Sequence, residues 1–402
     1  MAYYAGCADC STRALKGKTL IHAAFARKWV VIRVNETLNF DDVFVRRLYK
    51  GHFKVSMTSQ IHSEIHELLS SEGVQEQMKR VMDSDEIWIK PNLSNARPPE
   101  TGCITHPAAV KAIIDFLLDS VEGKPIRIVE TITYHKGKGM NEILAKLPPN
   151  ERAAIEDKLS DKDPDQDMHD FGFNLLLELG GLKDLVEGYK EDGKNVDVLN
   201  LSKQPVMSPV ESRKISESVD GLLGEERMPE DEIKKKLVDH IPSCLGDERK
   251  IGLISLALPK THDDPEAYMT ATMKNIGLGL YLKYKSFMHK DFAKAMLYNF
   301  AIWKVGLADR IFGIVSGPYG QDREGPIFGR AVDFPYVVGG SDLLKVDAVT
   351  AVLTLGRVDL INQLSTFRLA SDTLGKLPPV ATLEEILPYS LNYEPYPYKS
   401  QD

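Results

Sequence analysis

The fold is decided by the stretch Lys250–Gly279, KIGLISLALPKTHDDPEAYMTATMKNIGLG. Its first part, Ile251–Leu258, is an apolar run with the length of a fully buried strand. Pro259 ends this strand, because proline has no N–H to donate to a sheet ladder. The residues Lys260–His262 then stand where a buried strand reaches the edge of its sheet. In open α/β sheets, ligands bind outside the carboxyl ends of the strands. The stretch therefore predicts an α/β fold with a polar site at this edge.

A second part of the chain repeats this arrangement. The strand predicted at Glu86–Ile89 leads directly into Lys90-Pro91-Asn92, and Thr105-His106-Pro107 then opens an amphipathic helix in which proline occupies the first turn. Ile126–Val129 is the next predicted strand and ends at Glu130. This strand–loop–helix–strand unit has the length of one parallel crossover.

We therefore expect a mainly parallel, mixed sheet flanked by helices. The α/β core domain is predicted over residues 86–356, with helical and charged insertions at about 135–185 and 202–248 that form a partial cap. Residues 1–85 are predicted to be a mixed segment packed on this core, and residues 357–402 a wrapping tail.

Composition excludes several classes of protein. The 402 residues carry a net charge of −8, which argues against nucleic-acid binding. No apolar run approaches the roughly 20 residues that cross a bilayer, so no membrane association is expected. Four cysteines do not make a disulfide framework, and we expect a cytoplasmic protein.

Later segments add further polar groups at predicted strand ends. Ser316–Gly320 forms a tight, Gly-rich loop after a strand, which would allow the backbone to approach a ligand. Asp342 is a predicted helix cap, and Gly356 a predicted helix stop. Asp347 lies one turn inside that helix, where the helix dipole stabilises a carboxylate.

Three short patterns have metal-like spacing but are interpreted as surface or incidental features. Each lacks the additional ligands that a metal site needs. They are Cys7 with Cys10, His62 with His66, and the cluster Asp167, His169 and Asp170.

In this order the strand-end motifs resemble the family catalogued as domain of unknown function 362, whose members are often described as iron–sulfur-protein-like. The resemblance spans about residues 86–356. This chain lacks the clustered cysteines of many members, so no iron–sulfur cluster is expected, and Val315-Ser316 stands where the family usually has an acidic residue. The matching residues are Lys90-Pro91-Asn92, Thr105-His106-Pro107, Glu130, Lys260-Thr261-His262, Thr270 with Lys274-Asn275 and Gly277, His289, Asp309, Gly317-Pro318-Tyr319-Gly320, and Asp342 with Val346-Asp347-Ala348-Val349.

The first functional hypothesis is an enzyme acting on a small carboxylated or phosphorylated metabolite by acid–base chemistry, as in a racemase or epimerase. Histidine titrates near working pH, and lysines neutralise an anion. The predicted catalytic residues are His106, His262, Lys260 and Lys90. The predicted substrate-binding residues are Asn92, Thr105, Lys274, Asn275, Gly317 and Gly320.

Two alternatives remain open at this point. A divalent transition metal, iron or zinc, would make the protein a His-rich metal-dependent oxidoreductase. The other alternative is a non-catalytic accessory protein that holds a ligand or metal, and a homo-oligomer is compatible with either. The predicted metal ligands are His106, His262, His289, Glu130, Asp309 and Asp347.

Overall fold

A computed structural model gives the structure of the chain. The Cys7–Cys10 pair and the side chains of Asp167 and His169 lie outside the described part. The described residues are 37–48, 57–131, 144–160, 168–262, 269, 271–283, 285–371 and 373–393.

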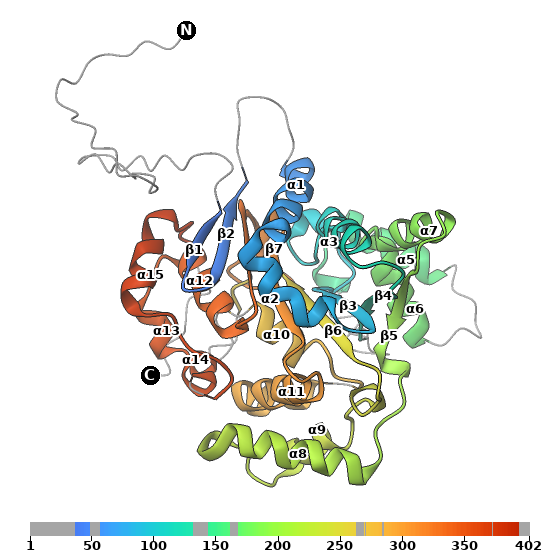
Figure 1. Cartoon of the computed structure of the whole chain (residues 1–402). Coiled ribbons are helices and arrows are strands. Elements are labelled where there is room, and N and C mark those ends of the chain that lie inside the picture. The colour runs from blue at the N-terminus through green and yellow to red at the C-terminus, as the bar shows by residue number, and fades with distance from the viewer. Residues whose placement is uncertain are drawn as a thin grey trace, which may run out of the picture.

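An eight-stranded sheet forms the centre of the molecule (Figure 1). The strands from β7 to β5 run parallel, whereas β10, β2 and β1 are each antiparallel to the neighbour before them. The predicted α/β fold with a mainly parallel, mixed sheet is thereby confirmed. In spatial order the strands are β1 (Leu38–Phe40), β2 (Val43–Arg47), β10 (Tyr336–Gly340), β7 (Ile311–Ser316), β6 (Ile251–Ala257), β3 (Glu86–Pro91), β4 (Ile126–Glu130) and β5 (Val196–Asn200).

The five parallel strands have a doubly wound order. The chain runs outward from β3 through β4 to β5, then returns to place β6 on the other side of β3 and β7 beyond it. The direction of winding therefore reverses between β3 and β6. In sheets of this kind, the crevice at the carboxyl ends of the two strands beside the reversal is the usual ligand site.

Helices cover both faces of the sheet, and successive strand residues feed two separate cores. In β6, for example, Leu253 belongs to one core and Ile254 to the other. The helices of the Ile254 core are α1 (Met57–Ser70), α2 (Glu72–Met82), α3 (Pro107–Ser120), α5 (Pro149–Ser160), α6 (Met168–Leu179) and α7 (Leu182–Glu191).

The Leu253 core is covered by helices from the second half of the chain. Helices α8 and α9 come from the predicted insertion at 202–248 and pack on α11. Helix α8 lies on the side of α11 that faces away from the sheet (Figure 1). These helices are α8 (Pro209–Leu223), α9 (Glu232–Val238), α10 (Thr272–Gly277), α11 (Phe292–Gly306), α12 (Leu343–Leu355), α13 (Asp359–Gln363), α14 (Ser365–Ala370) and α15 (Val380–Ile386).

Several predicted boundaries are confirmed by the capping geometry. Helix α3 begins at Pro107, and the His106 side chain accepts a hydrogen bond from the Ala108 N–H. Asp342 caps α12, and Gly356 ends that helix in the left-handed conformation. The predicted end of β3 is too early, because the strand continues to Pro91, which still contributes a carbonyl at the last position.

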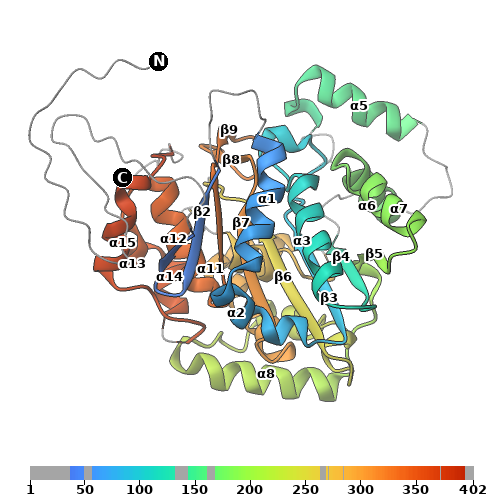
Figure 2. The ribbon, with the colours of Figure 1, turned by 45° about the horizontal axis from the view of Figure 1, so that its top comes forward.

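Two hairpins were not predicted. β1 and β2 are joined by Asp41 and Asp42, both with positive φ, as a two-residue type I′ turn requires. β8 (Tyr319–Asp322) and β9 (Arg330–Asp333) form a second, two-stranded sheet beyond the carboxyl end of β7 (Figure 2). Within the described residues, every helix is too short or too polar to cross a bilayer.

Candidate functional site

Four lysines gather where β3 and β6 end. Lys90 is the second-last residue of β3, and Lys260 stands three residues after β6. Lys274 comes from α10, and Lys285 directly precedes the short helix η5 (Ser286–Lys290). The charge of Lys274 interacts with those of Lys260 and Lys285, and the charge of Lys285 with that of Lys90. We call these four residues the lysine cluster.

Lys90 is held by an ion pair inside the protein. Its side chain is 2% exposed. Its Nζ atom lies 2.8 Å from Glu130 Oε2, 2.7 Å from the Pro91 carbonyl oxygen and 3.3 Å from Asn275 Oδ1. Burial lowers the pKa of Lys90, and the Glu130 carboxylate opposes that shift. Since three acceptors match the three N–H bonds of an ammonium group, Lys90 has a positioning role.

Lys260 is equally buried but has only uncharged oxygen acceptors in contact. Its Nζ donates to Asn92 Oδ1 and Ser94 Oγ, both at 2.8 Å, and to the Cys103 carbonyl. Burial lowers the pKa of Lys260 to about 8, and the positive charges of Lys90 and Arg97 add to this effect. Lys260 therefore anchors the loop after β3 while its charge contributes to the electrostatic field of the edge.

Lys274 and His262 are in direct contact. The Lys274 Nζ atom lies 3.1 Å from His262 Nδ1 and also touches Nε2 of the same ring. Burial lowers the pKa of Lys274 well below its usual value, and the charges of Lys260 and Lys285 lower it further. Two cations in contact repel each other, so the pair is stable with one proton rather than two. Phe292 closes one side, with its ring 5.8 Å from Lys274 Nζ.

Lys285 is a site residue that sequence reasoning missed. It is partly buried, and burial lowers its pKa to about 8. Among the described residues, its side chain forms no hydrogen bond or ion pair. The signal in the sequence is weak: a lysine between Tyr284 and Ser286, within an apolar and aromatic stretch.

The loop after β3 brings the remaining predicted polar residues to the same edge. The Asn92 N–H donates to Thr105 Oγ1 at 2.8 Å, and the Thr105 N–H donates to the Asn92 carbonyl. The next residue, His106, uses Nδ1 as the acceptor that caps α3, which leaves the ring proton on Nε2. Burial lowers the pKa of His106, so the ring favours its neutral form. His106 is thus suited to donate a hydrogen bond from Nε2.

Helix α10 is fixed by a buried carboxylate from another helix. Asp347 of α12 accepts hydrogen bonds from the Thr272 N–H and hydroxyl, both at 2.6 Å, and from the N–H groups of Ala271 and Met273. Burial outweighs these contacts and raises the pKa of Asp347 to about 6. Asn275 locks the other side of α10, since its Nδ2 donates to the Lys90 carbonyl at 2.8 Å. Asp347 and Asn275 therefore fix α10, the helix that carries Lys274.

Comparison with known proteins gives one match. The profile of the family described as Domain of unknown function (DUF362) matches residues 87–156 and 237–352. The chain belongs to the DUF362 family. Neither the curated proteins nor the solved structures contain a significant match. The whole lysine cluster lies inside the two matched segments, whereas α8 lies between them. The four lysines therefore lie in the parts of the chain that the family profile matches.

The six metal ligands predicted for this DUF362 chain do not form one site. Glu130 is paired with Lys90, and Asp347 is committed to α10. Asp309 lies two residues before β7, at the opposite edge of the sheet, and pairs with Lys304 at 2.5 Å. His289 is exposed in η5, with its ring 5.4 Å from that of Phe292.

His106 and His262, the two remaining candidates, have the contacts given above. Within the described part of the chain, there is no group of three or more His, Cys, Asp or Glu residues placed to hold a metal ion. The described residues thus do not bring the six predicted ligands together, and the iron or zinc centre stays a prediction.

The two glycines predicted to bind substrate also make close packing contacts. A Cβ atom at Gly320 would lie 2.6 Å from the Pro259 carbonyl oxygen, and one at Gly317 would lie 2.5 Å from Leu258 Cδ2. Strand β8 thereby packs directly against the segment that leads to Lys260. Gly320 lets two parts of the backbone approach each other closely, which supports Lys260 indirectly.

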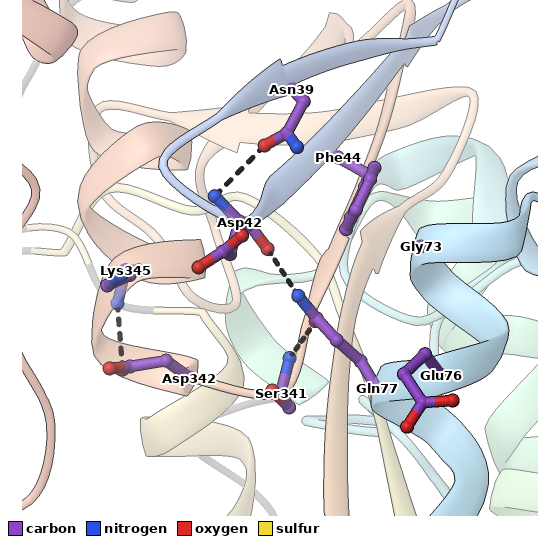
Figure 3. Close-up of a pocket in the computed structure, with 9 residues that line it drawn as sticks. All are labelled: Asn39, Asp42, Phe44, Gly73, Glu76, Gln77, Ser341, Asp342 and Lys345. Atoms are coloured by element: carbon purple, nitrogen blue, oxygen red, sulfur yellow. Dashed lines mark hydrogen bonds between the residues drawn. The ribbon is translucent and has the colours of Figure 1, made fainter.

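A hollow of about 530 Å³ lies elsewhere, between the β1–β2 turn, α2 and the start of α12 (Figure 3). Figure 3 shows Gln77 between two backbone groups, where its amide donates to the Asp42 carbonyl and accepts from the Ser341 N–H. Asp342 is occupied as the cap of α12. These polar groups bind one another and join the hairpin to the sheet, so this hollow lacks the surplus charge of the lysine cluster.

Proposed function

We propose that the protein binds a small carboxylated or phosphorylated metabolite at the carboxyl edge of β3 and β6 and moves a proton on it. The observation that carries this proposal is the contact between Lys274 and His262 within the lysine cluster. Because the pair holds one proton rather than two, its unprotonated nitrogen can act as the base that takes a proton from a substrate carbon or oxygen and later returns it. The negative charge of the bound substrate would offset the second positive charge that the pair then carries. The site also stands at the reversal of strand order, where doubly wound sheets bind their ligands.

The other groups at this edge would orient the substrate and stabilise its charge. Lys285 and the positive field of Lys260 would attract an anion, and His106 Nε2–H would donate a hydrogen bond to it. Proton removal next to a carboxylate develops negative charge on the carboxylate oxygens, which nearby ammonium groups stabilise. The proposed reaction class is therefore proton abstraction and return, as in racemisation or epimerisation.

Solvent deuterium exchange tests this proposal even though the product is not identified. The whole chain is incubated in D2O with a panel of small hydroxy and keto acids and phosphorylated metabolites. Proton NMR then follows the loss of signal at each carbon. We expect exchange with a subset of the panel, and a decrease of about 10²–10⁴-fold in His262→Gln and Lys274→Met. Lys183→Met, which removes an exposed lysine of α7, is the matched control.

A second candidate is a non-catalytic protein that binds the same anion. The observation in its favour is that Lys90 and Lys260 have all three N–H bonds occupied, as expected of residues that only shape a positive field. Anion binding without deuterium exchange would support this candidate. Stoichiometric metal in the purified protein, lost in His106→Ala and His262→Ala, would instead favour a metal-dependent enzyme. We also propose a cytoplasmic location, since Cys103 and Cys244 are both free thiols.

A further inference from the structure

We propose that the lysine cluster selects a doubly charged phosphate monoester over a singly charged carboxylate, and that Lys285 determines this preference. The inference rests on the anion site of the proposed function and specifies the chemical class of its ligand. It follows from the number of positive charges at the edge, from the contacts that each already has, and from the use of lysine in place of arginine.

The described residues leave a surplus of positive charge. Glu130 neutralises Lys90, and it is the one described carboxylate in contact with the Nζ of any of the four lysines. Lys260, Lys274 and Lys285 have only uncharged groups in contact, or none, among the described residues. A monoanion would compensate one of these three charges and leave two close together. A dianion compensates two, so the surplus favours a ligand with two negative charges.

The type of cation favours phosphate over a dicarboxylate. Arginine matches a planar carboxylate with two parallel hydrogen bonds, whereas lysine acts as a point charge with rotatable donors. Arg97 is the arginine whose charge reaches the cluster, and its Nε and Nη2 atoms bind the Glu151 carboxylate at 2.7 and 3.1 Å. Lysines are thus the cations left for the ligand. The charge of Lys274 interacts with those of Lys260 and Lys285, and the charge of Lys285 with that of Lys90. The lysines can therefore act together on the two negative charges of one tetrahedral phosphate group.

Lys285 is assigned the deciding role because of its contacts. Lys90 and Lys260 are fixed by three acceptors each, and Lys274 is engaged with His262. Lys285 is partly exposed and has all its donors available with respect to the described residues. Lys285 directly precedes η5, whose His289 ring lies 5.4 Å from the Phe292 ring, and that same Phe292 ring lies 5.8 Å from Lys274 Nζ. The segment of Lys285 therefore borders Lys274, in keeping with the interaction between their charges.

Isothermal titration calorimetry of the whole chain tests the inference at pH 7.5 with methyl phosphate, acetate and malonate. We expect methyl phosphate to bind about tenfold or more tightly than acetate. Lys285→Met should lose about tenfold in affinity for methyl phosphate and less for acetate, while Lys285→Arg, which keeps the charge, should retain the preference. Lys183→Met should behave as the wild type. Melting curves of both Lys285 variants establish that they are folded.

The outcomes separate this inference from the proposed function. Equal affinities for acetate and methyl phosphate, or tighter binding of malonate, would overturn the phosphate assignment while leaving an anion site. An unchanged preference in Lys285→Met would overturn the role of that residue. Absence of any binding would overturn both proposals. Phosphate binding without deuterium exchange would support this inference and refute the acid–base chemistry.

Discussion

Lys90 and Lys260 leave adjacent parallel strands at the same edge of the sheet, yet only Lys90 has a carboxylate in contact. The Lys90 Nζ lies 2.8 Å from Glu130, whereas the Lys260 Nζ is surrounded by the oxygens of Asn92, Ser94 and Cys103. Glu130 therefore neutralises Lys90, whereas no carboxylate among the described residues contacts Lys260 and neutralises its charge. Lys90 therefore acts mainly on stability through its ion pair, whereas the charge of Lys260 can also act on a bound anion.

Removal of the Glu130 charge should strongly destabilise the protein. In Glu130→Gln, Lys90 would remain buried without a counter-charge, which costs about 3–5 kcal/mol. Urea unfolding measures the change. The double variant Lys90→Met/Glu130→Leu should recover much of the loss, because an apolar pair carries no buried charge. If Glu130→Gln were as stable as the wild type, Lys90 would have to be neutral in the folded protein.

Lys260→Met should destabilise the loop that follows β3. The change removes three hydrogen bonds from a charged donor and leaves the Cys103 carbonyl without this partner, at an expected cost of about 3 kcal/mol. Differential scanning calorimetry, with Lys183→Met as the control, provides the comparison. A decrease no larger than in the control would contradict the anchoring role of Lys260.

Asp347→Ala should weaken both stability and anion binding. The variant leaves three N–H groups at the start of α10 without their acceptor, with an expected cost of about 2 kcal/mol. Since α10 carries Lys274, affinity for methyl phosphate should fall as well. Thr350→Ala is a matched control, because this buried hydroxyl bonds only within α12 in the described contacts. An affinity loss of the same size in Thr350→Ala would refute a specific role for Asp347.

Lys285 should make stability depend on pH in the alkaline range. Its pKa is about 8 in the folded protein and near 10.5 when unfolded. Between these values the unfolded state binds more protons, so the Lys285 contribution to the free energy of unfolding increases as pH rises. Below pH 8 the buried charge is a full penalty. Lys285→Met should therefore raise the melting temperature at pH 7, and this gain should shrink toward pH 10. A gain that stays constant over this range would contradict the assignment.

Local sequence signals predicted much of the fold and the position of Lys90 and Lys260 at one edge of the sheet. His106 with Pro107, and Asp342 with Gly356, are capping signals whose meaning depends on a few neighbouring residues, and the structure confirms them. Apolar runs before Lys90 and Lys260 likewise predicted buried strands. The Asp41-Asp42 turn was missed because it lacks the glycine that usually marks a type I′ hairpin.

Roles that depend on pairing between distant segments could not be predicted. Dipole reasoning assigned Asp347 to its own helix, whereas the structure uses it to cap α10. Sequence reasoning treated Glu130 as a metal ligand. It could not anticipate the contact between Glu130 and Lys90, because this contact depends on β3 and β4 being neighbours in the sheet. Asp309 was included from the family pattern, but it precedes its strand and so lies at the opposite edge.

The strand order also sets when the site can form during synthesis. β3 lies between β4, which is made soon after it, and β6, which begins at residue 251. A nascent chain that has not yet reached β6 exposes β3 as an open edge, and such edges promote pairing with other chains. The last two cluster lysines emerge later still. Fragments that stop before residue 250 should therefore aggregate and bind no anion, because the two halves of the site are completed only when the late strands insert beside the early ones.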